Sequence, residues 1–471
     1  MRPHLYTIAA DRPFLATLAA GLLRLRDGDP LLLARTIVLL PTRRSARALH
    51  EAFLRAAPGG AAGKPLLLPR LRPIGDLDAD EILPIDGADM VPPALSALRR
   101  RLLLTRLVLK WGEQRGGDGL LPGQAASLAA SLARLVDTVA SEGASFARLA
   151  DLVPEDLAEH WQVVRRFLEI LPQAWPQVLA GEGALDTAER RNRLLRQQAQ
   201  AWAETPPEAP VVAAGLSGGM PALTELIAVV AALPTGAVVL AGLDRSRDRT
   251  EWAAIEEDEA HPQHLLALLL QQLGCAPAEV RDWPPSEACE HSTGLAPSLP
   301  SPACGGGSGW GQDEGPRLRL ELVAEALRPA ATTDAWRRLP PAPAEALAGV
   351  SRYDCPSAQQ EAVTIALLLR RKLETPGASA ALVTPDRDLA RRVAAELRRW
   401  DIAIDDSAGL PLPRTPPGAF LRLVLELAES RLAPVPLLAA LGHPLAAGGM
   451  APARFRELSR RLALAIRGPR P

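Results

Sequence analysis

Threonine and arginine follow directly after two buried apolar runs of the sequence. The first run is residues 36–40. The second is residues 380–384, which ends on Thr384 itself, and each run leads into a helical pattern. Backbone amides at the beginning of a helix and guanidinium groups both bind phosphate. We therefore expect both turns to contact a phosphodiester backbone. The candidate DNA-contacting residues are Thr42, Arg43, Arg44, Arg47, Thr384 and Arg387.

Residues 215–219, Gly-Leu-Ser-Gly-Gly, match the G-x-S-x-G pattern of a hydrolase nucleophile and lie between an apolar run and a helical pattern. Asp244 and then His261 or His264 follow Ser217 in the order that such a triad requires. They follow it closely, in a charged stretch that proline interrupts. A glycine-rich structural turn is the preferred interpretation, and a serine hydrolase centred on Ser217 is the alternative.

Lysine is rare in this chain, which matters for ATP chemistry. A P-loop needs a lysine between a strand and a helix, followed by serine or threonine. Lys64 follows a helical pattern and precedes Pro65, while Lys110 and Lys372 lie inside helical patterns. We predict no ATP site and no catalytic residue in this chain.

Metal binding is not predicted either. The cysteines, Cys275, Cys289, Cys304 and Cys355, form no C-x-x-C pair. Pro262 argues against a shared ligand face for His261 and His264, and Cys289 with His291 makes a poor pair. The acidic group of Asp76, Asp78, Asp80 and Glu81 is interpreted as a solvated loop. We expect no cofactor, no disulfide framework and a reducing, cytoplasmic location.

The 471 residues include 53 Lys and Arg and 54 Asp and Glu, a formal net charge of −1. Nucleic-acid binding would therefore depend on local basic patches, because the whole chain carries no net positive field. No uncharged apolar stretch is long enough to span a membrane, and no signal peptide is evident. We expect no membrane contact.

Strand patterns at residues 5–8, 36–40, 211–214 and 237–241 alternate with helical patterns, which predicts an α/β fold with a mostly parallel sheet. A second βαβ-like unit is expected from Val350, with strands at 380–384 and 402–404. The expected segments are 1–92 and 206–282 for a first domain, 93–205 for an all-helical insertion, 283–316 for a low-complexity linker or insertion, 317–349 for a helical connection, 350–417 for a partial second domain, and 418–471 for the beginning of a second helical insertion.

Several motifs together resemble the AddB family of double-strand-break repair subunits, of the alphaproteobacterial type. These motifs are LLPTRRSAR (residues 39–47), LPRLRPIGD (68–76), GLSGGMP (215–221), VVLAGLD (238–244) and AALVTPDR (380–387), the last continuing through Trp400 to residues 405–409. The resemblance covers nearly the whole chain except about residues 284–316.

The resemblance implies two RecA-like domains of the superfamily-one helicase type, each with a helical insertion, and no working motor. It places Thr42, Arg43 and Arg44 in a DNA-facing loop and residues 384–387 in the equivalent region of the second domain. An AddA-like helicase–nuclease subunit would be the partner, and double-stranded ends and single-stranded DNA the ligands, in repair by recombination.

Members of that family are about twice as long and carry a nuclease domain with magnesium and a 4Fe-4S cluster, for which this sequence has no counterpart. We therefore interpret the chain as a truncated, N-terminal portion of such a subunit, without nuclease and cluster ligands. Residues around Cys304 depart from the family pattern. An inactive folded remnant is a third interpretation, because half of a sheet domain exposes unpaired strand edges.

Overall fold

The computed structural model describes residues 3–25, 29–56, 66–74, 91–114, 120–146, 167–168, 170–284 and 314–466. The chain forms two compact units. Of the described residues, 3–284 and 314–350 belong to the first unit, and 351–466 belong to the second. Among the helices described, none combines the length and the apolar character needed to cross a membrane.

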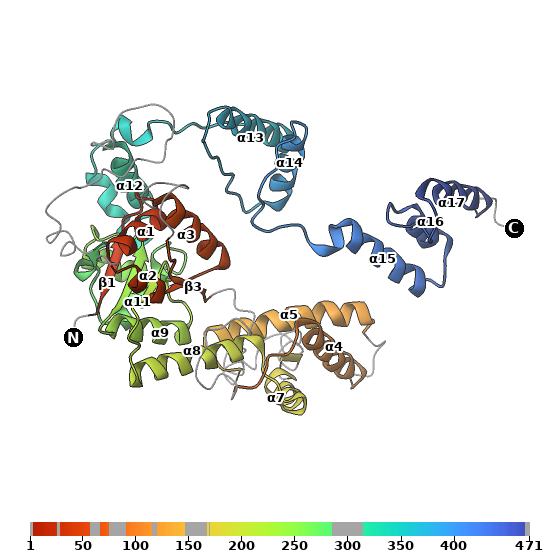
Figure 1. Ribbon diagram of the computed structural model, residues 1–471, viewed down its shortest axis with the longest axis horizontal. Coiled ribbons are helices and arrows are strands. Elements are labelled where there is room, and N and C mark those ends of the chain that lie inside the picture. Colours follow the sequence, from red (N-terminus) through yellow and green to blue (C-terminus); the bar gives the residue numbers. More distant parts are fainter. Residues whose placement is uncertain are drawn as a thin grey trace. The chain divides into compact units, whose positions relative to one another are not determined.

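A six-stranded, parallel β-sheet forms the centre of the first unit (Figure 1). Its strands are β1 (Leu5–Ile8), β2 (Ile37–Leu40), β3 (Arg70–Pro73), β4 (Val211–Ala214), β5 (Gly236–Ala241) and β6 (Arg281–Asp282). They lie in the order β3-β2-β4-β5-β1-β6, and every pairing is parallel. The predicted α/β class with a parallel sheet is confirmed, whereas the RecA-like identity of the sheet remains a prediction.

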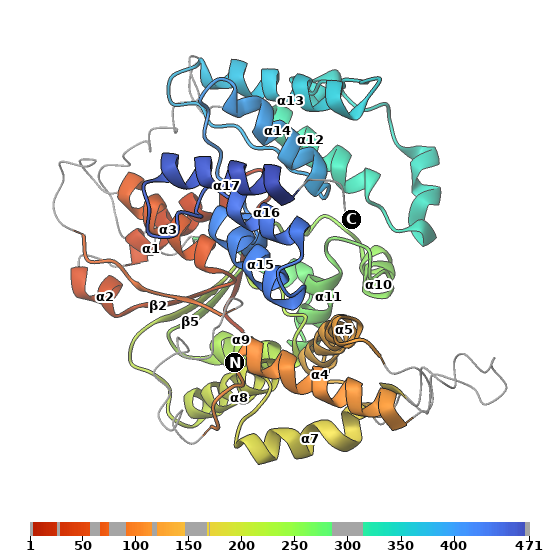
Figure 2. The ribbon, with the colours of Figure 1, turned by 90° about the vertical axis from the view of Figure 1, so that its right-hand side faces the viewer.

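Helices cover both faces of this sheet (Figure 2). One face packs against α1 (Phe14–Leu25), α2 (Pro30–Arg35) and α3 (Arg43–Ala56). The other packs against α8 (Thr187–Glu204), α9 (Pro221–Ala232), α10 (Arg249–Glu257) and α11 (His264–Gln272). Successive strand residues alternate between the two layers, with Leu39 on one side and Val38 and Leu40 on the other. This burial on both sides explains why the strands read as continuous apolar runs.

Helices α4 (Ala97–Gln114), α5 (Pro122–Ser141), α7 (Ile170–Glu182) and α8 follow β3 and precede β4 in the chain. The first three build a hydrophobic cluster of their own, with Leu104, Leu132 and Trp175 inside it. Residues of α8 such as Leu194 and Trp202 instead belong to the core under the sheet. Helix α8 therefore anchors this helical region to the sheet.

Arg100 holds the helical region together from within. Its side chain is only 8% exposed, its Nε lies 2.6 Å from an oxygen of Asp186, and its Nη1 donates to Asp137 at 2.9 Å. The indole of Trp175 donates to the other Asp186 oxygen at 2.5 Å. Burial raises the pKa of Asp186, despite the opposing effect of Arg100. The run of three arginines at this point is therefore not simply a solvated face, because its middle member is buried.

The chain between residues 314 and 350 returns to the first unit as α12 (Glu314–Ala326) and the 3-10 helices η6 (Ala330–Arg338) and η7 (Ala344–Leu347). An ion-pair cluster links this region to the segment after β5. Arg247 contacts Asp244 at 3.1 Å and Glu325 at 3.3 Å, and Arg328 pairs with Glu251 and Glu325. Both arginine side chains are nearly buried, so loss of a carboxylate partner would leave an uncompensated buried charge.

The second unit contains helices and no strand among its described residues. These helices are α13 (Ala358–Leu373), α14 (Arg387–Arg398), η8 (Leu412–Arg414), α15 (Pro416–Glu429), α16 (Pro434–Gly442) and α17 (Pro452–Ile466). The strands expected at 380–384 and 402–404 are not hydrogen-bonded into a ladder. That expectation was wrong because an apolar run becomes a strand only where a neighbour supplies its hydrogen bonds.

Candidate nucleic-acid interface

The turn from β2 to α3 lies at the carboxyl edge of the sheet, where parallel α/β sheets bind their ligands. Thr42 precedes the first residue of α3, and it exchanges hydrogen bonds with Ser45. The Ser45 amide donates to Thr42 Oγ1 at 3.0 Å, and the Thr42 amide donates to Ser45 Oγ at 3.0 Å. Both hydroxyl groups thus cap the helix, and they fix the direction in which the first turn of α3 leaves the sheet.

Arg43, Arg44 and Arg47 are exposed on the beginning of α3. The helix has four arginines against one glutamate, and its first turn contains no acid. Positive side chains at the positive end of a helix dipole oppose helix stability. This turn therefore concentrates positive charge, and a phosphate is the kind of group that its amides and guanidinium groups would stabilise.

The space next to this turn is filled by the chain itself. A Cβ placed on Gly215, whose φ is +68°, would lie 3.2 Å from the ring of Phe14 and 3.9 Å from Pro41. Phe14, at the beginning of α1, thereby covers the ends of β2 and β4. A Cβ on Gly242 would lie 3.2 Å from Ala10. At these two glycines the carboxyl edge of the sheet is therefore filled by Phe14 and Ala10.

Two further arginines lie at the same edge, and sequence reasoning did not select them. Arg12 is exposed in the turn between β1 and α1, beside the exposed Asp11. Arg72 is half-buried on β3 and pairs in register with Leu39 of β2. Arg12 follows a buried strand just as Arg43 does, so the same positional rule would have found it. Arg72 had no such signal, because β3 follows the apolar run at residues 66–69 instead of coinciding with it.

The second candidate turn, Thr384 to Arg387, has a different electrostatic character. Both terminal nitrogens of Arg387 donate to the carboxylate of Asp406, at 3.0 Å and 2.6 Å. This hydrogen bonding raises the pKa of Arg387. Thr384 Oγ1 accepts a hydrogen bond from the Asp386 amide at 3.0 Å. A phosphate would have to displace Asp406 in order to reach this arginine.

The first amides of α14 are also occupied. Asp386 caps the helix by accepting from the amides of Asp388 at 2.7 Å and Leu389 at 3.2 Å. Asp388 adds a second negative charge to the first turn and pairs with Arg391. These carboxylates satisfy the helix terminus and repel an incoming anion. The two predicted turns therefore differ in the charge of the groups at their helix termini.

Ser217 is not joined to an acid and a histidine by the hydrogen bonds of the described residues. Asp244 accepts from the amide and hydroxyl of Ser246, at 3.0 Å and 2.5 Å, and pairs with Arg247. His264 Nδ1 is 3.1 Å from the carbonyl of Ile255. Gly218 and Gly219 both have positive φ, as a tight strand-to-helix turn requires. The geometry favours a structural turn over a nucleophile.

Burial and local hydrogen bonds shift the pKa values of Asp244 and His261. Burial alone would raise the pKa of Asp244, but hydrogen bonds from Ser246 and the neighbouring Arg247 outweigh it and lower the pKa. Burial lowers the pKa of His261, whose Nδ1 accepts from the Gln263 amide at 3.1 Å. Asp244 therefore stays ionised to anchor Arg247.

Metal ligation finds no support in the part of the chain that the structure describes, where no three His, Cys, Asp or Glu side chains gather. The acidic group Asp76, Asp78, Asp80 and Glu81, and likewise Cys289, His291 and Cys304, lie outside the described residues. Burial raises the pKa of the Cys275 thiol, and the Cys355 thiol lies 3.7 Å from the hydroxyl of Thr364.

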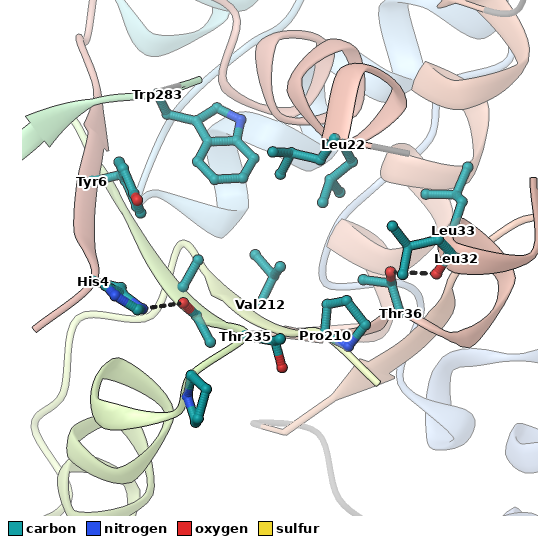
Figure 3. A pocket seen from close by; sticks show the side chains of 14 residues that line it. His4, Tyr6, Leu22, Leu32, Leu33, Thr36, Pro210, Val212, Thr235 and Trp283 are labelled. Carbon is teal, nitrogen blue, oxygen red and sulfur yellow. Dashed lines mark hydrogen bonds between the residues drawn. The ribbon is translucent and has the colours of Figure 1, made fainter. Parts of the chain in front are cut away.

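An apolar pocket of about 290 Å³ lies at the opposite, amino edge of the sheet (Figure 3). His4, Pro210 and Gly236 line it at the beginnings of β1, β4 and β5, and Leu22 and Trp283 form part of its wall. His4 Nδ1 is 3.0 Å from the carbonyl of Gly236. The pocket is separated from the arginines of α3 by the length of the strands, so it forms no part of the candidate interface.

A scan against protein-family models gave no match, and a search of curated proteins likewise gave none.

Proposed function

We propose that this chain binds DNA and serves as a scaffold in double-strand-break repair, as the helicase-like, motor-inactive portion of an AddB-type subunit. The observation that carries the proposal is the turn at Thr42. There a capped helix terminus without acids presents Arg43, Arg44 and Arg47 at the carboxyl edge of a parallel sheet. The motif resemblance of residues 39–47 supports the same assignment.

Phosphate recognition fits the chemistry of this turn. Guanidinium groups form paired hydrogen bonds with phosphate oxygens, and helix amides add a favourable dipole. Such contacts read the DNA backbone and carry no sequence information. The chain as a whole has a formal net charge of −1 and supplies no long-range attraction, so binding would be local and would weaken steeply as salt competes for the phosphates.

Motor inactivity is part of the proposal and has its own support. The turn from β1 to α1, residues 9–13, contains no lysine and no glycine. Ala10 and Phe14 fill the space beside Gly242 and Gly215, where a phosphate-binding loop would need open backbone. We infer that an AddA-like partner supplies ATP-driven movement along DNA.

We assign the nuclease chemistry of the proposed complex to a part of that complex outside this chain. A 4Fe-4S cluster requires four cysteine thiolates in one site, and the raised pKa of the Cys275 thiol disfavours its thiolate. Cys289 and Cys304 lie outside the described residues, and among the residues that the structure describes no three His, Cys, Asp or Glu side chains gather to hold a cluster or magnesium. No reaction step is therefore assigned to this chain.

The proposal is tested by fluorescence anisotropy of the full chain with a labelled blunt duplex and a labelled single strand, titrated at several salt concentrations. We expect binding to both, with an affinity that falls steadily as salt rises. Adding ATP should leave the affinity unchanged. Absence of binding at low salt, or binding that is independent of salt, would contradict the DNA role.

The scaffolding half of the proposal requires a separate experiment. We expect a purified AddA-like subunit to co-elute with this chain in size-exclusion chromatography and to retain ATPase activity stimulated by DNA. A complex that forms without the DNA contact, or a DNA contact without the complex, would show which half of the proposal fails.

A further inference from the structure

Residues 314–350 of the first unit, which include α12, η6 and η7, form a mostly exposed segment that we call the strap. Among the described residues, no side chain of the strap belongs to the two hydrophobic clusters that enclose the sheet. Its apolar side chains Val323, Trp336 and Leu347 are exposed instead. The strap therefore contributes little to the hydrophobic core of the unit.

Hydrogen bonds within the strap hold it together. Arg319 of α12 donates to the carbonyl of Ala346 in η7 at 3.0 Å. The indole of Trp336 in η6 donates to the carbonyl of Glu325 in α12 at 3.0 Å. In the described part of the chain, no backbone–backbone hydrogen bond joins the strap to residues 3–284. The strap thus has internal contacts that do not depend on the sheet.

The ion pairs described between the strap and the rest of the first unit lie at α10. Arg247, which precedes α10, contacts Glu325 of the strap at 3.3 Å. Arg328 of the strap pairs with Glu251 of α10. Glu325 also pairs with Arg328 at 2.8 Å, so this one carboxylate contacts both arginines.

Burial makes both arginines depend on their carboxylate partners while the strap is attached. The side chains of Arg247 and Arg328 are 4% and 8% exposed. A buried charge that loses a partner is strongly destabilising, because water cannot replace the partner. If the strap detached, water would hydrate both guanidinium groups. Loss of the Glu325 charge would therefore penalise the attached state much more than the detached state.

We propose that the strap detaches from the first unit as one piece while the sheet stays folded, with Glu325 as the latch that holds it against Arg247. Segments with few buried apolar contacts open at a lower free energy than the core of a domain. The exposed apolar side chains of the strap and its internal hydrogen bonds are the features of such a segment.

Detachment would affect the connection between the two units. The second unit begins at residue 351, directly after the strap. A detached strap would lengthen the chain that connects this unit to the sheet. The strap is therefore a conformational device that controls the length of this connection. It uses no residue of the Thr42 turn, so the proposal does not depend on DNA binding.

Hydrogen exchange of the full chain tests the latch with Glu325→Gln, which keeps the size of the side chain and removes its charge. Amides of α12 should exchange at least about tenfold faster in this variant, whereas amides of β4 and β5 should be unchanged. Glu321→Gln is the matched control. Glu321 lies on the same helix and forms an exposed pair with Arg317, so its loss should leave α12 unchanged.

Urea provides a second test on the natural sequence. Amides of α12 should lose protection at a lower urea concentration than amides of β4 and β5. Any of three results would overturn the proposal. These are loss of protection in α12 and the sheet together, in urea or in Glu325→Gln, exchange of α12 that Glu325→Gln does not change, and an equal acceleration in Glu321→Gln.

Discussion

The two strand-to-helix turns at Thr42 and Thr384 look alike in sequence but have opposite electrostatic environments. At the first turn, Thr42 and Ser45 cap the helix with neutral hydroxyl groups. At the second, Asp386 caps the helix with a carboxylate, and Asp406 holds Arg387. A threonine and an arginine after an apolar run are therefore insufficient to define a phosphate site. The two turns differ in the group that caps the helix, which is a neutral hydroxyl at Thr42 and a carboxylate at Asp386.

Reversing the charge of the first turn should have the largest effect. The double substitution Arg43→Glu and Arg44→Glu should weaken DNA binding by at least about tenfold, because two attractive phosphate contacts become repulsive. Anisotropy at fixed salt measures the change. Arg337 and Arg338 are also adjacent and exposed in the first unit, so Arg337→Glu with Arg338→Glu is the matched control. Equal losses in both variants would mean that only net charge matters.

Removing the cap of α3 should lower stability. Thr42→Ala leaves the Ser45 amide without its acceptor and should reduce the free energy of unfolding by about 1 kcal/mol. Thr42→Ser keeps the hydroxyl group and should change it little. Denaturant titration of the full chain checks both. If alanine and serine behave alike, the capping role of Thr42 is wrong.

Neutralising the second turn should make it more like the first. Asp386→Asn with Asp388→Asn keeps an amide acceptor at the cap and removes two negative charges, so DNA affinity should rise about two- to threefold. The control is Glu426→Gln with Glu429→Gln, which removes two exposed charges from α15. A larger gain in the control than at α14 would argue against the electrostatic contrast.

The edge that carries the first turn should also respond to acid through Asp244. Its pKa in the folded chain lies below the ordinary value of an aspartate, so its ionised form stabilises the fold above that ordinary value. This contribution is lost as the pH falls through the lowered pKa of the folded state. The stability difference between the natural chain and Asp244→Asn should therefore shrink in acid. A difference that is constant with pH would contradict the assigned ion pair with Arg247.

Strands buried on both faces were predictable from sequence, because β1, β2, β4 and β5 are runs of apolar residues. Strand β6 was not, since Arg281 and Asp282 carry no such pattern and pair only because β1 lies beside them. Conversely, residues 380–384 have the pattern and lack the neighbour. Local pattern predicts the tendency of a segment to be extended, whereas pairing depends on distant residues.

Some features of the candidate site could likewise be predicted from the sequence, and others could not. The exposure of Arg43 and Arg44 followed from their position after β2. The burial of Arg100 among Asp137 and Asp186 did not follow, because its partners lie 37 residues and more away in the chain. The pairing of Arg387 with Asp406, 19 residues later, likewise depends on how the second unit folds. The sequence located the arginines, whereas tertiary contacts determined how deeply each is buried.

The central proposal is that DNA contacts the turn at Thr42 and not the turn at Thr384. Hydrogen exchange of the full chain, with and without a saturating single-stranded oligonucleotide, tests this directly. We predict slower exchange in residues 41–47 on DNA binding and no change in residues 384–389. Protection of 384–389 without protection of 41–47 would contradict the account.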